Sequence, residues 1–256
     1  MPLSDAPPAR SLLIVNADDW GGNRPCTDAI AACFTAGSVT SATAMVHMAD
    51  SRRAAGLARE RALPIGLHLN LVEPFDDRAT PAPVRERQRR LVRRLRSRRV
   101  RYWIYDPSLR ADVEGAIADQ LECFRALYAT EPTHVDGHEH AHLLANVLLA
   151  RTLPCGIKLR TSAQPRGGRA AGMARSARGR LIARRFCTPD YFFALRGLEP
   201  EFGGSGLEPA LELASGASVE VMVHPGAADE LALLQSRHWL RCLADRPLGS
   251  YAALAC

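Results

Sequence analysis

The run Ser11-Leu12-Leu13-Ile14-Val15-Asn16 is short, apolar and rich in branched side chains, and it leads into Ala17-Asp18-Asp19. A continuous apolar run of this length is typical of a strand that is buried on both faces. Gly21-Gly22 then breaks the chain, and apolar residues recur at helical spacing from Thr27 to Ala36, with Gly37 at the position of a C-cap. This region therefore predicts a buried strand, a loop that carries two carboxylates, and a helix.

Strand and helix patterns alternate along the rest of the chain. Further strands are predicted at Ser38–Met45, Pro64–Leu71, Thr133–His142, Gly156–Arg160 and Val219–His224, and further helices at Arg52–Glu60, Ala111–Tyr128, Asn146–Leu153 and Ser236–Ala244. This alternation favours an α/β fold with a parallel sheet, either closed into a barrel or open and doubly wound. A chain of 256 residues that is 47% hydrophobic can form one such domain or two smaller ones, and we expect a single domain over residues 1–256.

The positive net charge of +6 is concentrated in two arginine-rich segments, which we interpret as insertions at about residues 85–101 and 166–185. These segments hold 17 of the 33 basic residues but only 1 of the 27 acidic residues, so the rest of the chain is acidic. Arginine clusters can bind phosphates, anionic lipid headgroups or nucleic acid. The alternative is a solvated helix face in a protein that uses arginine in preference to lysine.

Other features of the composition exclude several classes of protein. No apolar run reaches the roughly 18 residues of a membrane-spanning helix, and residues 1–10 lack the basic-then-apolar order of a secretory signal. The seven cysteines are odd in number and contain no C-x-x-C pair, so neither a disulfide framework nor a thiolate zinc site is indicated. We expect a protein of the reducing cytoplasm.

Four of the eight histidines lie in the run Thr133-His134-Val135-Asp136-Gly137-His138-Glu139-His140-Ala141-His142. Side chains along a strand alternate between its faces, so we expect one face to carry His134, Asp136, His138, His140 and His142. Imidazoles and carboxylates gathered at a strand end can hold a divalent metal, with a nearby carboxylate orienting a histidine ring. The alternative is a disordered histidine-rich tract, but the apolar residues in and after the run favour a metal or catalytic role.

Adjacent carboxylates at a strand end have a chemical use. One can bind a metal while the other accepts a proton from a metal-activated water. The pair Asp18-Asp19 is weak evidence alone, because turns and helix N-termini also collect aspartates. However, His68, His138 and His224 also lie at or near predicted strand ends. In parallel α/β folds the chemistry sits at the carboxyl ends of the strands, so we expect these side chains to meet.

Five motifs in this order and spacing resemble those of the YdjC-like carbohydrate deacetylases, the family that includes chito-oligosaccharide deacetylase and the deacetylase-like proteins of hopanoid biosynthesis. The motifs are Leu12–Gly21, Gly37–Thr43, Gly66–Leu71, Thr133–His142 and Val221–Gly226. The resemblance runs from about Leu12 to Leu254. It implies a distorted (β/α) barrel, similar to TIM barrels and to the polysaccharide deacetylases, which agrees with the alternation described above.

The resemblance also implies roles for single residues. It places the catalytic base at Asp18 and three metal ligands at Asp19, His68 and His138. It places a general acid at His224 and a carboxylate that supports the ligand shell at Asp136. Arg160, at the end of a predicted strand, is the candidate to orient Asp18 through a charge-assisted hydrogen bond. The candidates for lining the substrate pocket are His140, His142 and Asn70.

Together these assignments predict a metal-dependent hydrolase that removes an acetyl group from an N-acetylated sugar or glycoconjugate. The first alternative is a metal-dependent hydrolase that acts on another amide or on a phosphoester. The second is a non-catalytic protein that binds anionic surfaces or nucleic acid through its arginines. This second alternative is less favoured, because a degenerate relic would be expected to have lost some of the site residues.

The expected cofactor is one divalent metal ion. Family resemblance implies Mg or Zn, and two nitrogen ligands with one carboxylate also suit Mn, Co or Fe. The expected partner is an N-acetylated sugar or glycoconjugate, and the arginines leave open an acidic or lipid-linked one. A homodimer and a peripheral membrane contact also stay open, whereas nucleic acid is a less favoured partner.

Overall fold

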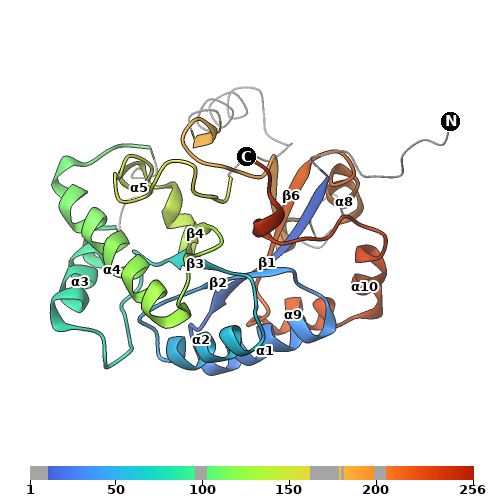
Figure 1. The fold of residues 1–256 in the computed structure, drawn as a ribbon, viewed down its shortest axis with the longest axis horizontal. Coiled ribbons are helices and arrows are strands. Elements are labelled where there is room, and N and C mark those ends of the chain that lie inside the picture. Colours follow the sequence, from blue (N-terminus) through green and yellow to red (C-terminus); the bar gives the residue numbers. More distant parts are fainter. Residues whose placement is uncertain (1–10, 96–102, 162–178, 180–181, 199–205) are drawn as a thin grey trace.

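The computed structural model describes residues 11–95, 103–161, 179, 182–198 and 206–256. Within them, six parallel strands form one sheet in the order β4-β3-β2-β1-β6-β5. The strands are β1 (Leu12–Trp20), β2 (Ser41–Ala44), β3 (Ile65–Leu69), β4 (Val135–Gly137), β5 (Tyr191–Ala194) and β6 (Ser218–Val223). The sheet is curled into a half-barrel with helices around it (Figure 1), which confirms the expected α/β fold.

Helices connect the parallel strands, as parallel neighbours require. The α-helices are α1 (Arg24–Ala36), α2 (Ser51–Glu60), α3 (Ala82–Leu95), α4 (Arg110–Tyr128), α5 (Ala145–Leu148), α7 (Leu195–Leu198), α8 (Glu208–Leu213), α9 (Ala228–Leu234) and α10 (Arg237–Leu243). Three short 3-10 helices are η2 (Pro107–Leu109), η3 (His138–Leu143) and η5 (Tyr251–Ala253). The predicted C-cap glycine is confirmed, because Gly37 ends α1 with a φ of 70° and donates its N–H to the last turn.

The core lies between the sheet and these helices. The central strands β1, β3 and β6 are buried almost throughout, which explains why their sequences are apolar runs instead of alternating patterns. Helix α4 packs inward through an apolar stripe formed by Val113, Ile117, Leu121 and Phe124. Burial of these stripes against the sheet supplies the main favourable term in the free energy of folding.

The segment Gly156–Arg160 is extended but is not a regular strand, which differs from the prediction. It makes two isolated parallel bridges, one between Leu159 and Val135 of β4 and one between Lys158 and Cys187. The N–H of Leu159 donates to the carbonyl of Cys187 at 2.8 Å. These bridges continue the sheet past β4 towards the segment that enters β5. They also carry Arg160 to the same end of the sheet as the site residues of β3 and β4.

The histidine-rich run is a strand that leads into a turn, as the pattern predicts, but the strand ends too early for all five residues to share one strand face. Strand β4 ends at Gly137, and η3 begins at His138. Glu139 and His140 have positive φ angles of 48° and 57°, so the chain turns sharply there. Because strand periodicity stops at the turn, it does not place His140 and His142 on a strand face.

The first arginine-rich segment forms helix α3, which packs on α4. Its buried face includes Leu91 and Val92, and two of its arginines pair with acids of α4. Arg90 contacts Asp112 at 2.7 Å, and Arg87 pairs with Asp119. Residues 96–101 and most of the second segment, 166–185, lie outside the described residues. In the described part, α3 is therefore an amphipathic helix whose charges are partly neutralised within the chain.

Cys187 and Cys256 form a disulfide, with their Cα atoms 5.2 Å apart. The sequence pattern indicated no disulfide framework, and this pair corrects that expectation. The residues are 69 positions apart, and they meet because the C-terminal segment runs back against the bridge region near β5. Sequence spacing alone carries no information about such long-range pairing.

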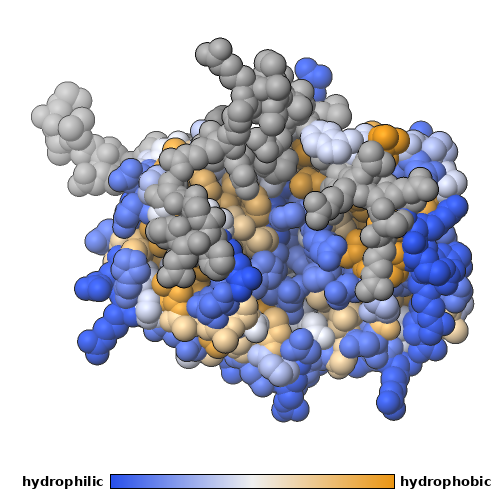
Figure 2. Space-filling view, turned by 180° about the vertical axis from the view of Figure 1, so that it is seen from behind, coloured by the Kyte–Doolittle hydropathy of each residue, from blue (hydrophilic) through white to orange (hydrophobic). Residues whose placement is uncertain are grey.

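Among the described residues, no helix is both long enough and apolar enough to cross a membrane. Seen from behind, the surface is mostly hydrophilic, with separate hydrophobic areas (Figure 2). The large hydrophobic side chains that are exposed among the described residues are Trp103, Ile104, Leu149, Leu240 and Leu248. Single exposed apolar side chains of this kind are normal on folded proteins.

Strands β3 and β4 approach each other closely at Gly66, so a larger side chain at this position should lower the stability of the protein. A Cβ atom on Gly66 would lie 2.4 Å from Nδ1 of His134 and 2.7 Å from its carbonyl oxygen. We therefore expect Gly66→Ala to lower the free energy of unfolding by roughly 1–3 kcal/mol in urea titrations. The control is Gly56→Ala in α2, where an added Cβ meets nothing within 4 Å. Equal stability of the two variants would contradict the prediction.

Candidate functional site

Strand β1 delivers its two adjacent carboxylates to different surroundings. The strand runs four residues further than predicted, to Trp20, and its register against β2 shifts between Ala17 and Trp20. Within this irregularity Asp19 has a φ of 69°, in the left-handed region that non-glycine residues seldom adopt. Asp18 is buried, whereas the Asp19 side chain is 27% exposed. The two adjacent carboxylates therefore lie in different surroundings, with Asp18 inside the protein and Asp19 partly exposed to solvent.

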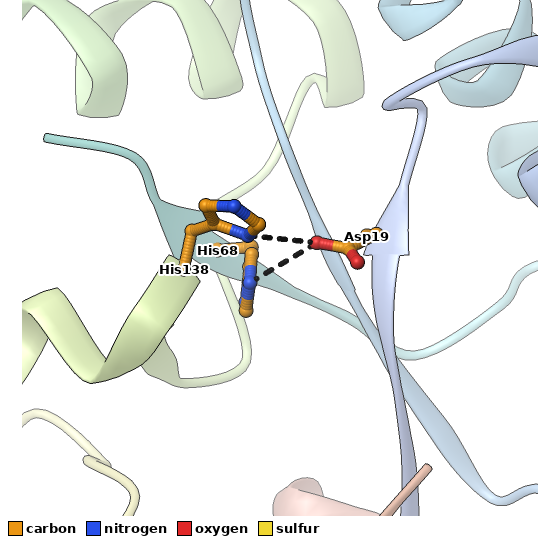
Figure 3. Close-up of side chains that lie close together, drawn as sticks. All are labelled: Asp19, His68 and His138. Carbon is orange, nitrogen blue, oxygen red and sulfur yellow. Dashed lines mark hydrogen bonds and ion pairs between the residues drawn. The ribbon is translucent and has the colours of Figure 1, made fainter. Parts of the chain in front are cut away.

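Asp19, His68 and His138 converge at the carboxyl ends of β1, β3 and β4 (Figure 3). Oδ1 of Asp19 lies 3.3 Å from Nε2 of His68 and 3.2 Å from Nδ1 of His138. Burial alone would raise the pKa of Asp19, but hydrogen bonds from the two histidines hold it well below its usual range. The site therefore brings together the three residues that the sequence proposed as metal ligands.

The ring of His68 is held in one orientation by its other nitrogen. Nδ1 lies 2.7 Å from Oδ1 of Asp136, and Oγ1 of Thr43 is 3.2 Å from the same nitrogen. Thr43 also donates to Oδ2 of Asp136 at 3.0 Å. This contact leaves Nε2 of His68 directed at Asp19. The structure thus places Asp136 where the sequence proposed a carboxylate that supports the ligand shell.

Arg160 is fully buried and contacts three carboxylates. It binds Asp18 in a bidentate manner, with Nη1 2.7 Å from Oδ2 and Nη2 2.6 Å from Oδ1. Its Nη2 atom also lies 2.6 Å from Oδ2 of Asp136, and its Nε atom donates to Glu220 at 2.9 Å. Burial alone would raise the pKa of Asp18, but the guanidinium holds it well below its usual range. The bidentate contact with Arg160 therefore favours the ionised form of Asp18 and fixes the orientation of its carboxylate.

His224 lies across the opening of the site. Ala17 of β1 is in register with Val223 of β6, so Asp18 and His224 follow these residues at the same edge of the sheet. The backbone N–H of His224 donates to Oε2 of Glu230 at 2.6 Å, and its Nδ1 is 3.6 Å from Oε1. Burial alone would lower the pKa of His224, but Glu230 and the nearby aspartates raise it.

A cavity of about 420 Å³ opens onto these groups. Its lining includes Asp19, His138, His224, Glu73, Met45 and Met48. Asp18 and His68 are buried and do not line the cavity. We call Asp19, His68 and His138 the triad. The cavity gives a small polar substrate access to two of its members, Asp19 and His138, and to His224.

The three residues proposed as substrate contacts lie in different places. Asn70 is buried in the turn after β3, where its Oδ1 accepts from the N–H groups of Val72 and Glu73. His142 is also buried, and neither of its ring nitrogens has a hydrogen-bond partner within the described part of the chain. His140 is partly exposed, with its ring 5.6 Å from that of Phe192. Asn70 thus supports the backbone of a turn instead of facing the cavity, which corrects the expected contact.

His134, the first histidine of the run, is buried away from the triad. Its ring stacks on Tyr251 with the centroids 3.6 Å apart and the planes 7° from parallel. Burial holds the pKa of His134 well below its usual range, so the ring is neutral. It is a core residue, as a buried histidine commonly is.

Three residues of the site were not assigned from the sequence. Glu73 lines the cavity, and its Oε1 lies 3.4 Å from Nε2 of His138. The available signal in the sequence was its position, because it is an acidic residue three positions after Asn70. Glu220 is a charged residue inside an apolar strand, which was a second available signal. Thr43 is the last residue of the motif Gly37–Thr43, which was a third signal.

The residues present fit a divalent metal ion. Two ring nitrogens face the same carboxylate oxygen at 3.2 and 3.3 Å. Ligand atoms around a tetrahedral metal at about 2.1 Å lie roughly 3.4 Å from one another, so this spacing is suitable. The partly exposed sides of Asp19 and His138 face the cavity, which leaves coordination positions accessible. Open positions are typical of catalytic metal sites.

Comparison with known proteins connects this geometry to a family. The model of the family described as "YdjC-like protein" matches residues 12–246. A chitooligosaccharide deacetylase of Klebsiella pneumoniae (strain 342) is 32% identical, and the alignment covers 94% of this chain and 98% of that protein. A human carbohydrate deacetylase is 35% identical over 54% of this chain, and the chain spans 43% of that relative's length.

A solved structure shares the fold. It is the crystal structure of a "putative cellobiose-phosphate cleavage protein" from Enterococcus faecalis V583, with a TM-score of 0.66 and 22% sequence identity. The match covers 96% of this chain and all of that one. At this level of identity the likeness concerns the fold alone, and it agrees with the curled parallel sheet.

Proposed function

This chain belongs to the YdjC-like protein family, and from that membership we propose that it is a metal-dependent carbohydrate deacetylase. Its reaction would be the hydrolysis of an N-acetylated sugar or glycoconjugate to acetate and a free amine. The names of two relatives, a carbohydrate deacetylase and a chitooligosaccharide deacetylase, support this substrate class. We further propose that Asp19, His68 and His138 hold one divalent ion.

One observation carries the proposal. The buried Asp18, which accepts two hydrogen bonds from Arg160, directly precedes the partly exposed Asp19 of the triad. Hydrolysis of an unactivated amide needs a nucleophile, a base beside it and an acid for the leaving amine. The chain supplies a candidate base on β1, the buried Asp18, and a candidate acid after β6, His224, which lines the cavity.

The chain's own residues divide the work. The chemistry that a divalent ion supplies when bound is activation of a water and polarisation of the acyl carbonyl. Asp18 would accept the proton of the attacking water at a carboxylate oxygen. Arg160 would keep that carboxylate ionised and fixed in orientation. His224 would deliver a proton to the nitrogen of the departing amine.

The ligand set guides the choice of metal. Two imidazole nitrogens and one carboxylate suit Zn, Mn, Co or Fe better than Mg by ligand softness, although Mg and Zn are the family expectation. We therefore propose a single divalent ion without committing to one element. Loading the metal-free protein with each of these ions in turn would identify the active form.

The test is acetate release. Purified protein is incubated with a panel of N-acetylated sugars and glycoconjugates, each with Zn, Mn, Co or Mg, and acetate and the free amine are measured together. We expect equal amounts of both products from at least one substrate. If no acetate forms with any metal while phosphate is released from a phosphoester, the alternative hydrolase takes the place of the deacetylase.

The raised pKa of His224 should be visible in the pH dependence of kcat. Burial alone would lower this pKa, but Glu230 and the nearby aspartates raise it, so the ring keeps its proton to higher pH. Because the acid form is lost as pH rises through that pKa, kcat should fall on the alkaline side. In Glu230→Gln we expect the alkaline limb of the kcat profile to move to lower pH, with the acidic limb unchanged.

The matched control for this change is Glu212→Gln, at an exposed glutamate of α8. Its kcat profile should coincide with that of the wild type. An alkaline limb in Glu230→Gln that stays at the wild-type pH would remove His224 from the role of acid.

A further inference from the structure

Glu220 contacts Arg160, and neither residue lines the cavity. Glu220 is a fully buried acid in the middle of β6. Its Oε1 accepts from Nε of Arg160 at 2.9 Å and lies 2.8 Å from Nη2. Asp18 and Asp136 contact the outer nitrogens of the same guanidinium. Glu220 thus contacts the edge of the guanidinium that carries Nε. This contact determines the orientation of the two outer nitrogens, Nη1 and Nη2.

Tyr251 completes this arrangement from the C-terminal segment. Its hydroxyl donates to Oε2 of Glu220, the oxygen that Arg160 does not use. The side chain is fully buried, and its ring stacks on His134. The ammonium of Lys158 donates to the carbonyl of Tyr251 at 2.7 Å, which fixes the backbone as well. These contacts hold the hydroxyl against Glu220.

The charges of this cluster make the contacts mutually dependent. Burial raises the pKa of Glu220 to about 7, although the Arg160 guanidinium and the Tyr251 hydroxyl oppose the rise. A buried carboxylate that loses one of its donors is costly, so it will rotate or take up a proton. Either event changes what Arg160 meets at its Nε edge and frees the guanidinium to turn.

We infer that Glu220 and Tyr251 are positioning residues for Asp18 that act through Arg160. The hydroxyl of Tyr251 orients the Glu220 carboxylate. Glu220 in turn fixes the plane of the Arg160 guanidinium that binds Asp18. The inference rests on the proposed function only in giving Asp18 the role of base. The family match ends at residue 246, so Tyr251 lies beyond the matched residues. The C-terminal segment thereby supports the site from outside the strands that carry its chemistry.

The first experiment compares Glu220→Gln with the wild type on N,N′-diacetylchitobiose in the metal-loaded enzyme. Glutamine keeps the shape of the side chain but removes the charge that attracts the guanidinium. We expect kcat to fall roughly ten-fold to a hundred-fold, because small misplacement of a catalytic group costs up to about that much. KM should stay within about two-fold of the wild type, since neither residue lines the cavity.

The second experiment uses Tyr251→Phe, with Tyr128→Phe as its matched control. Tyr128 is also buried and also stacks on an aromatic ring, that of Phe124 at 4.3 Å. Both changes remove one buried hydroxyl, so their effects on the melting temperature should be similar. We expect kcat to fall roughly five-fold to ten-fold in Tyr251→Phe alone, the value of about one hydrogen bond.

Crystal structures of the three variants supply a readout that does not depend on turnover. In Glu220→Gln and Tyr251→Phe we expect at least one of the two Arg160–Asp18 contacts, now 2.6 and 2.7 Å, to open beyond hydrogen-bonding distance. In Tyr128→Phe both should persist. The inference is overturned if both contacts persist in the two test variants, or if they open without lowering kcat. Absence of acetate release by the wild type would count against the proposed function, while the structures would still decide the geometry.

Discussion

Asp18→Asn should lower kcat by roughly a hundred-fold to ten-thousand-fold, the usual cost of losing a general base. Asparagine can still accept a hydrogen bond from Arg160, but it cannot take a proton from the attacking water. The metal content should stay near that of the wild type, because Asp19, His68 and His138 are unchanged. The measurement is kcat for acetate release, normalised to the metal content of each preparation.

The control for Asp18→Asn is Asp28→Asn, at an exposed aspartate of α1 that pairs with Arg53. Its kcat should equal that of the wild type. An Asp18→Asn enzyme within a few-fold of the wild type would show that another group accepts the proton. Loss of metal together with turnover would instead assign Asp18 to the metal site, with His68 and Asp136 as neighbours.

His138→Ala should remove the bound metal and with it the hydrolysis of every substrate. His138 supplies one of the two ring nitrogens beside Asp19, and alanine leaves only Asp19 and His68 to hold an ion. A site with two protein ligands is below the three that catalytic metal sites usually provide. Elemental analysis of the purified protein should show about one divalent ion per chain in the wild type and almost none in the variant.

The same loss is expected in Asp19→Ala and His68→Ala. His238→Ala is the control, because His238 is an exposed residue of α10. Its metal content should match that of the wild type. If all three ligand variants keep the wild-type metal content, the ion binds elsewhere and the proposed site is wrong.

Local patterns predicted much of the fold. The buried run Leu12–Asn16 and the helix Ala111–Tyr128 depend on residues close together in the sequence, and both are present in β1 and α4. The prediction failed where the chain changes direction within a few residues. The chain turns sharply after His138 because Glu139 and His140 adopt left-handed backbone angles, and nothing in an alternating pattern signals that turn.

The sites of long-range contact were the hardest to predict. Glu220 looked like a lone charge in a strand, and Tyr251 had no motif around it. Their roles depend on Arg160, which lies 60 residues from Glu220 and 142 residues from Asp18. Such contacts follow from the order of the strands and their register, which a single sequence does not specify.

The sequence by itself determined the alternation of strands and helices, the adjacency of Asp18 and Asp19, and the motifs that predict the triad. These features follow from covalent neighbours and from the short periods of strands and helices. Only the tertiary structure decided that Asp19 lines the cavity while Asp18 is buried against Arg160. That division depends on an irregular strand register and on burial of one guanidinium among three carboxylates, and both arise only when distant segments pack together.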